Sequence, residues 1–226
     1  AAFSADAGVT WGPEVKVSDN PAGAVVEMLP EIALHRDPAT DLVTVYVVWQ
    51  ELVSGTGLED GRIMLARFDE AMVRVDVADI RVDDVDGAGK WHPVVVPVGK
   101  RGNPVVVWVD ERDAGPRLSI FEHLYAAKGR GRRGHDDRPP LDFSKSRAVV
   151  RQKTVDPLAE QLANEWAPTI AYADRRVVLG WLDFRQYNWD VYSSFSRSGL
   201  RYSRPPTRVD DSVEFERLNS HPSLAY

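Results

Sequence analysis

The chain alternates short apolar runs with polar turns, and the runs recur in a fixed order. Each recurring unit begins with a proline followed by a few apolar residues, and the four prolines are Pro30, Pro93, Pro168 and Pro222. The next run in a unit is rich in valine and ends in tryptophan, at residues 45–49, 105–108 and 177–181. Runs of β-branched and aromatic residues bounded by Gly, Pro and Asp predict β-strands.

Two further strands complete the predicted unit. Third strands are expected at residues 62–67, 117–121 and 190–195. Fourth strands, which end in aspartate, are expected at residues 15–19, 80–84 and 207–211. Four strands per repeat are typical of a β-propeller blade, and neighbouring blades bury the faces that a single blade leaves open. The sequence therefore predicts an all-β propeller of four-stranded antiparallel blades, with about three blades in this chain.

A turn motif near the N-terminus links the repeat to a known family. Four residues fit the Asp-box pattern Ser-x-Asp-x-Gly-x-x-Trp, namely Ser4, Asp6, Gly8 and Trp11. Residues 195–202 form a shorter, degenerate copy. On these motifs the chain resembles the sialidase-like (BNR-repeat) propellers, in which the box marks the turn between third and fourth strands. A structural role is favoured, in which the aspartate accepts turn amides, the glycine permits an unusual backbone angle and the tryptophan packs under the turn.

The repeat divides the chain into a single propeller domain with incomplete ends. The expected parts are the end of one blade (1–29), three blades (30–92, 93–167 and 168–221) and the first strand of a next blade (222–226). The resemblance implies a six-bladed ring. Three blades would leave two sheet edges open, so we expect missing blades or a second chain, such as a two-fold partner, to close the ring.

The middle blade is expected to carry two insertions. Residues 128–134 are basic and rich in glycine, and a solvated loop is favoured there over a contact with an anionic glycan or a partner. Residues 156–163 predict a short helix, because Asp156 suits the N-cap, Pro157 suits the first turn and good helix formers follow.

Polar and aromatic residues cluster where second strands end and first strands begin. In a propeller these positions open on one face near the central channel, so we expect the side chains to converge on one mouth. The candidate ligand-binding residues are Trp91, His92, Asp110, Arg112, Trp166, Asp183, Arg185 and His221. Aromatic faces and Arg forks suit sugar recognition. Two alternatives stay open: the repeated Trp-x-Asp-x-Arg pattern favours an Asp–Arg pair that pins a loop, and Trp91 and Trp166 can pack between blades.

The sequence assigns no catalytic residue. The resemblance implies that a sialidase has three arginines, a Tyr–Glu pair and an acid–base aspartate, but its Phe-Arg-Ile-Pro-like motif is absent here. A glycosidase with paired carboxylates needs two acids about 5–10 Å apart, and the candidates are Glu51, Asp110, Glu111, Glu165 and Asp183. Residues 84–87 match part of a calcium loop but lack its other ligands, which favours a plain polar turn.

Composition narrows the classes of function. The net charge of −6 does not indicate nucleic acid as a partner, and the absence of cysteine removes disulfides and thiol catalysis. The chain has no apolar run of about 18 residues that would span a membrane. It also has no signal peptide at its start and no cofactor or metal motif. We expect a secreted or cell-surface bacterial protein without a cofactor.

These observations favour a non-catalytic binding or scaffold propeller that recognises a glycan or a protein on the mouth face. The first alternative is that the chain is part of a sialidase-like glycoside hydrolase. The second is that it is a structural subunit of a larger assembly. The fold is argued from the repeat, but function has to be argued from a site, because one fold hosts many functions.

Overall fold

The computed structural model describes most of the chain. The described residues are 1–4, 6–21, 23, 25–53, 60–112, 122–131, 140–150, 164–184, 189–203, 205–210 and 222–224. Across these residues the regular secondary structure consists of β-strands, as predicted. Within the same ranges, no helix has the length and apolar character needed to cross a membrane.

The strands form three antiparallel sheets, which we call blades A, B and C. Blade A contains β1 (Val25–Arg36), β2 (Val43–Val53), β3 (Gly61–Phe68) and β4 (Ile80–Arg81). Blade B contains β5 (Lys90–Val98), β6 (Asn103–Asp110), β7 (His123–Gly131), β8 (Leu141–Phe143) and β9 (Arg147–Ala148). Blade C contains β10 (Glu165–Ala173), β11 (Arg176–Asp183), β12 (Asp190–Ser196) and β13 (Thr207–Arg208).

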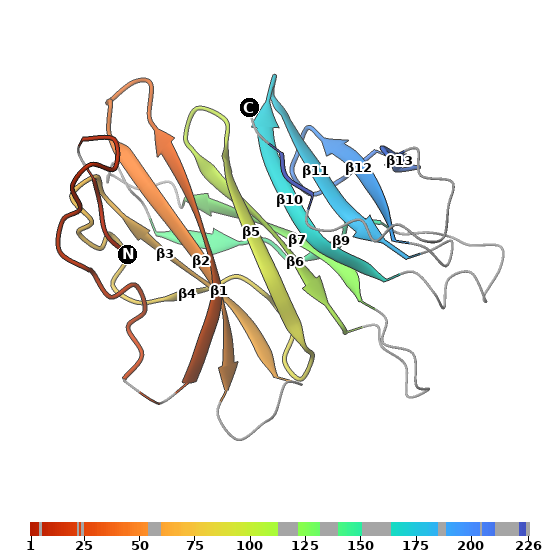
Figure 1. Ribbon diagram of the computed structural model, residues 1–226, viewed down its shortest axis with the longest axis horizontal. Helices are drawn as coiled ribbons and strands as arrows, with labels where there is room; N and C mark the ends of the chain where they lie inside the picture. Colours follow the sequence, from red (N-terminus) through yellow and green to blue (C-terminus); the bar gives the residue numbers. More distant parts are fainter. Residues whose placement is uncertain are drawn as a thin grey trace.

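The blades stand side by side in chain order (Figure 1). Their first strands are neighbours, because β5 contacts both β1 and β10. The second, third and fourth strands of each blade follow in order away from this line. Four-stranded meanders packed face to face around adjacent first strands form a β-propeller. The predicted all-β propeller fold is therefore confirmed, whereas the blade number of a complete ring stays a prediction.

Side-chain alternation along the second strands builds the core between blades. In β6, Val107 faces blade C, whereas Val106 and Trp108 face blade A. Successive side chains of a strand point to opposite faces, so one buried strand supplies two interfaces. Trp181 of β11 packs on blade B in the way that Trp108 packs on blade A, and neither ring is exposed. Burial on both faces explains the valine-rich runs that end in tryptophan.

A β-bulge connects the two repeated signals of the sequence. In β5, His92 and Pro93 together lie opposite the single residue Trp108, and β1 and β10 shift register at the same place. The residue before each proline has a positive φ, with values of 52° at Leu29, 49° at His92 and 44° at Ala167. Such angles are strained for residues with a side chain. A bulge of this kind bends its strand and redirects the side chains before it, which here lie at one end of the blade.

Blade B differs from the sequence prediction in its third strand. That strand is β7, and the residues predicted for it, 117–121, lie outside the described residues. Residues 128–131, predicted to begin a solvated loop, instead extend β7, and residues 129–131 pair with β8. Pairing satisfies the backbone groups of this glycine-rich stretch, which has a low intrinsic preference for a strand. The remainder of the basic segment and the predicted helix at 156–163 also lie outside the described residues.

The first and fourth strands also depart from the predicted bounds. Each first strand begins upstream of its proline, so the division of the chain into blades at the prolines stays a prediction. The fourth strands β4, β9 and β13 are only two residues long. Residues 15–19 are described but form no regular strand. Val15 and Val17 nevertheless pack against the apolar face of blade A, where a fourth strand was expected.

Candidate functional site

The blades share an end, here called the mouth, at which second strands stop and first and third strands start. In blade B the register pairs Asp110 with Lys90 on one side and with His123 on the other. In blade C it pairs Asp183 with Glu165. Six candidate ligand-binding residues lie at this end: Trp91, His92, Asp110, Arg112, Trp166 and Asp183. The remaining two, Arg185 and His221, lie outside the described residues.

A row of aromatic rings crosses the mouth from blade B to blade C. The imidazole of His92 meets the indole of Trp166 edge-on, with ring centroids 5.0 Å apart. The centroid of Trp189 lies 6.4 Å from that of Trp166 and 5.2 Å from that of Phe184. All four residues are partly exposed, and we call them the aromatic row. Sequence reasoning missed Trp189 and placed Phe184 at the mouth without naming it as a candidate, although both flank the loop between the second and third strands of blade C.

The tryptophans of the mouth also contribute to the core. Trp91 and Trp166 both pack against the apolar cluster between blades B and C, and each keeps part of its surface exposed. In the sequence, each of these tryptophans directly precedes a bulged residue of its first strand. One part of each ring therefore packs between the blades while another part is exposed at the mouth.

A cavity of about 710 Å³ lies along the first strands. Its walls contain the bulged residue and the proline of all three blades, together with residues 222–224. His92 belongs both to the cavity wall and to the aromatic row, so the row lies at the edge of the cavity. A hollow of this size, with aromatic rings and a few polar groups at its edge, has the dimensions of a small-molecule site.

Two glutamates, Glu111 and Glu122, lie beside Trp91. The Trp91 indole lies close enough to the Glu122 carboxylate to favour its ionised form, and the Glu122 carbonyl accepts the Glu165 N–H at 2.9 Å. Gly89 leaves room for this arrangement, because a Cβ there would overlap both Glu111 and Trp91. Burial, and then the charge of Glu111, raise the pKa of Glu122 to about 7. Sequence reasoning named Glu111 but missed Glu122.

The repeated Trp-x-Asp motif is engaged within each blade. The indole N–H of Trp108 donates to Asp110 Oδ2 at 2.8 Å. In blade C, the indole N–H of Trp181 donates to Asp183 Oδ2 at 3.1 Å. Neither aspartate has any exposed surface. Both carboxylates therefore hold their own tryptophan beneath the mouth and do not reach its solvent.

The guanidinium of Arg112 is surrounded by partners from blades A and B. Its Nε and Nη2 donate to the two Asp110 oxygens at 2.9 and 2.6 Å. Its Nη1 donates to Asp84 Oδ1 at 3.1 Å and to Ser146 Oγ at 2.8 Å. The group also lies over the ring of Tyr125, 4.1 Å from the centroid. Arg112 thus joins the loop after β6 to the loop after β4.

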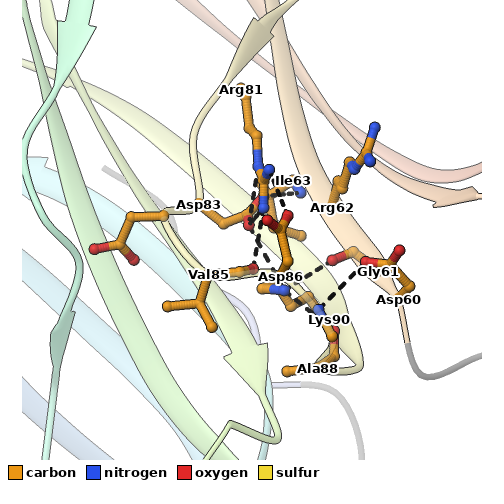
Figure 2. A network of polar contacts seen from close by, with 12 residues as sticks. Asp60, Gly61, Arg62, Ile63, Arg81, Asp83, Val85, Asp86, Ala88 and Lys90 are labelled. Carbon is orange, nitrogen blue, oxygen red and sulfur yellow. Dashed lines mark hydrogen bonds and ion pairs between the residues drawn. The ribbon is translucent and has the colours of Figure 1, made fainter.

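Beneath the mouth, a buried lysine fastens blade B to blade A (Figure 2). Lys90 Nζ donates to the backbone oxygens of Gly61 and Ala88, at 2.9 and 3.1 Å. It lies 3.6 Å from Asp83 Oδ2, and neither side chain is exposed. Asp83 also accepts the N–H of Ile63 at 2.8 Å. This pair connects the segment just after the fourth strand of one blade to the first strand of the next.

The positions that correspond to Asp83 and Lys90, in that order, hold different residues at the other interfaces. Between blades B and C they are Val150 and Glu165, and Glu165 Oε2 itself accepts the N–H of Leu124 at 2.8 Å. On the opposite side of blade A, Ser18 Oγ donates to Glu27 Oε2 at 2.8 Å. Between blades A and B and between blades B and C, where Lys90 and Glu165 are buried, each of these side chains is bonded to backbone groups, as buried polar groups require.

Residues 84–87, which match part of a calcium loop, make polar contacts to blade B and within blade A. Asp84 accepts the N–H of Ser146 at 3.1 Å, and Asp86 pairs with Arg81 at 2.7 Å. Burial raises the pKa of Asp84, but the bonds from Ser146 and Arg112 outweigh it, so the pKa lies below its usual value. Among the described residues, no group of three or more His, Asp or Glu could hold a metal ion.

The Asp-box forms a compact turn of polar contacts. The Asp6 carboxylate accepts the N–H of Thr10 at 2.8 Å, the Thr10 hydroxyl at 2.6 Å and the Ser4 hydroxyl at 2.8 Å. The N–H of Gly8 donates to Ser4 Oγ at 2.7 Å, and Gly8 has a φ of 89°. The bonds from Thr10 and then Ser4 lower the pKa of Asp6 to about 2.

The tryptophan of the box lies against its own turn, where its ring is 3.9 Å from a Cβ placed at Gly8, but it is not buried there. Trp11 is 65% exposed. In the degenerate copy at 195–202 the corresponding ring, Tyr202, is buried in the core between blades B and C. That burial comes from the neighbouring blade, because Gly199 of the same turn lies against Val105 of β6. The aromatic position of the box is therefore buried by the blade beside it and not by the turn itself.

Comparison with known proteins adds little to this geometry. No protein-family model matches the sequence, and no curated protein matches it either. Among solved structures, one from work on the GH130 mannoside phosphorylase family has a TM-score of 0.44 at 16% identity, covering 80% of this chain and 48% of its own. An α-L-arabinofuranosidase from Lactobacillus brevis has a TM-score of 0.42 at 12% identity, covering 84% and 58%.

A GH43 endo-arabinanase from Bacillus licheniformis has a TM-score of 0.41 at 16% identity, covering 82% of this chain and 60% of its own. This chain therefore spans about half of the GH130-related structure and less than two thirds of the other two. Because all three TM-scores lie below 0.5, the propeller class is assigned here from the blades themselves. Membership of the sialidase-like family stays a hypothesis.

Proposed function

We propose that the protein is a non-catalytic binding propeller that recognises a glycan at its mouth. The observation that carries the proposal is the aromatic row at the edge of the central cavity. Partly exposed rings can stack on the apolar faces of sugars, and nearby carboxylates can accept hydrogen bonds from sugar hydroxyls. Glu111 and Glu122 lie beside Trp91 and supply such acceptors.

The test is binding to a glycan array, followed by calorimetry on the strongest ligand. Trp166 contacts both His92 and Trp189, so Trp166→Ala interrupts the row at its centre. Loss of a central aromatic anchor costs about 2 kcal/mol, roughly thirtyfold in affinity. Trp11→Ala is the matched control, because Trp11 is exposed in the N-terminal turn and belongs to neither the row nor the cavity. Equal losses in the two variants would contradict the proposal.

The second candidate function is that of a sialidase-like glycoside hydrolase, of which this chain would be a part. The observation that favours it is Glu122, a half-buried acid beside Glu111 with a pKa of about 7. An acid of this kind can protonate a leaving oxygen near neutral pH. Release of a fluorogenic aglycone by the purified chain, abolished by Glu122→Gln, would support hydrolysis. Tight glycan binding without release would support the non-catalytic proposal.

A scaffold role, with closure of the ring by further blades or a second chain, is the third candidate. Two exposed apolar residues favour it. Ile32 is 57% exposed whereas Val95, at the same place in blade B, is 7% exposed. Val209 is 60% exposed whereas Val82, at the same place in blade A, is 2% exposed. Light scattering would separate a dimer from a monomer. We also propose that the protein is secreted or displayed on the cell surface, which fractionation of the source cells would test.

A further inference from the structure

The arginine predicted to hold an acidic ligand is not available at the mouth. All three nitrogens of the Arg112 guanidinium donate to protein oxygens, on Asp110, Asp84 and Ser146. One face of the group is covered by the Tyr125 ring. A guanidinium recognises a carboxylate through two parallel N–H groups. Arg112 could offer such a fork to a ligand only by breaking its bonds to Asp110 or Asp84.

Two other cations at this end of the strands are engaged in similar ways. Lys90 is fully buried and donates to two backbone oxygens beside Asp83. Arg62, at the start of the third strand of blade A, lies 3.7 Å from Glu51. Their positive charges therefore compensate protein carboxylates. Of the two, only Arg62 reaches the surface, with a side chain that is 36% exposed, and it belongs to blade A and not to the aromatic row of blades B and C.

Among the residues that the structure describes, the exposed charge beside Trp91 of the mouth is negative. Glu111 and Glu122 are both partly exposed and lie against Trp91, and the Glu122 carbonyl is bonded to the residue before Trp166. Burial, and then the charge of Glu111, both raise the pKa of Glu122, so this place disfavours negative charge. Hydroxyl groups of a sugar, by contrast, can donate to either carboxylate without any cost in charge repulsion.

We propose that the mouth selects uncharged glycans and disfavours glycans that carry a carboxylate, such as sialosides and uronosides. The inference rests on the proposed glycan binding and states which class of sugar is bound. Stacking on the aromatic row is common to both classes of sugar. The carboxylates beside Trp91 and the engagement of Arg112 separate them, because a ligand carboxylate would be repelled by the first and not gripped by the second.

The experiment compares glycans that differ only in a carboxylate. One pair is a galactose oligomer and the galacturonate oligomer of equal length, and another is N-acetyllactosamine with and without terminal sialic acid. Affinities are measured by calorimetry at low salt and pH 8, where Glu122 is ionised. We expect the uncharged member to bind on the order of tenfold more tightly or better, and the ratio to shrink at high salt. Glu122→Gln should reduce the ratio further.

The possible results distinguish a failure of the charge selectivity from a failure of glycan binding itself. Equal or tighter binding of the carboxylated members would overturn the charge selectivity and leave glycan binding intact. A ratio unchanged by Glu122→Gln and by salt would overturn the assignment of selectivity to the carboxylates. Failure of the protein to bind any member of a broad array would overturn the proposed function itself, and the selectivity with it.

Discussion

The buried pair Lys90–Asp83 offers the sharpest test of how the blades are held together. Lys90→Met removes the ammonium but keeps most of the apolar stem in a site with no exposure. Removing one partner of a buried pair costs about 3–5 kcal/mol. We expect a loss of about 3 kcal/mol, at the lower end, because Asp83 keeps its bonds to Arg81 and to the Ile63 N–H.

The interface between blades B and C indicates how the loss can be reversed. There, valine occupies the place of Asp83 and Glu165 occupies the place of Lys90, and the glutamate accepts the third-strand amide directly. Lys90→Glu alone buries two carboxylates together and should destabilise by at least about 3 kcal/mol. Adding Asp83→Val recreates the arrangement of the next interface, so the double variant should be more stable than Lys90→Glu by roughly 2 kcal/mol.

The assay is urea unfolding followed by tryptophan fluorescence. The parent protein, Lys90→Met, Lys90→Glu and the double variant are compared at one temperature. Trp108 and Trp181 are fully buried on either side of blade B and report on these interfaces. A Lys90→Met variant as stable as the parent would refute the assigned role of the ammonium. A double variant no more stable than Lys90→Glu would refute the equivalence of the two interfaces.

Two further predictions concern a glycine and a titrating acid. Gly23 and Gly199 have nearly the same φ, 78° and 77°, but only at Gly199 would a Cβ overlap a neighbour, Val105. Gly23→Ala should cost about 1 kcal/mol of backbone strain and Gly199→Ala about 1–3 kcal/mol more, and equal shifts in Tm would contradict this. The pKa of Glu122 is raised from 4.5 to about 7 on folding, so stability should fall as pH rises through that window. Tm measured across it should flatten in Glu122→Gln, and an unchanged slope would contradict the shift.

Most strand positions could be predicted because a proline and a tryptophan mark the same bulge in each unit. The proline and the tryptophan of each unit lie opposite one another at the bulge. Either residue alone is a weak signal, but their recurrence in a fixed order defines the first and second strands. The third strand of blade B escaped this approach. Residues 123–131 contain alanines and glycines that have little strand preference, and it is pairing with β6, β8 and β9 and packing between two other blades that keep them extended.

The contents of the mouth were harder to predict, because they depend on contacts between blades. The sequence pattern around Arg112 indicated an Asp–Arg pair, and the contact with Asp110 is local. The contact with Asp84 spans 28 positions and crosses from one blade to another, so no local pattern reveals it. Glu122 escaped because the third strand was placed over the segment before it. The exposure of Trp11 escaped because its burial depends on a neighbouring blade.

Each bulge places a position that varies in sequence next to positions that recur in every blade. The residue before each proline and the proline itself both line the cavity, but only the proline and the tryptophan opposite it recur in every blade at the shift of register. Leucine, histidine and alanine already occupy this position in the three blades, so the backbone accepts side chains of very different size and polarity there. The scaffold is in this sense modular. A combinatorial library at Leu29, His92 and Ala167 could retarget the cavity to new ligands while the blades continue to assemble as they do now.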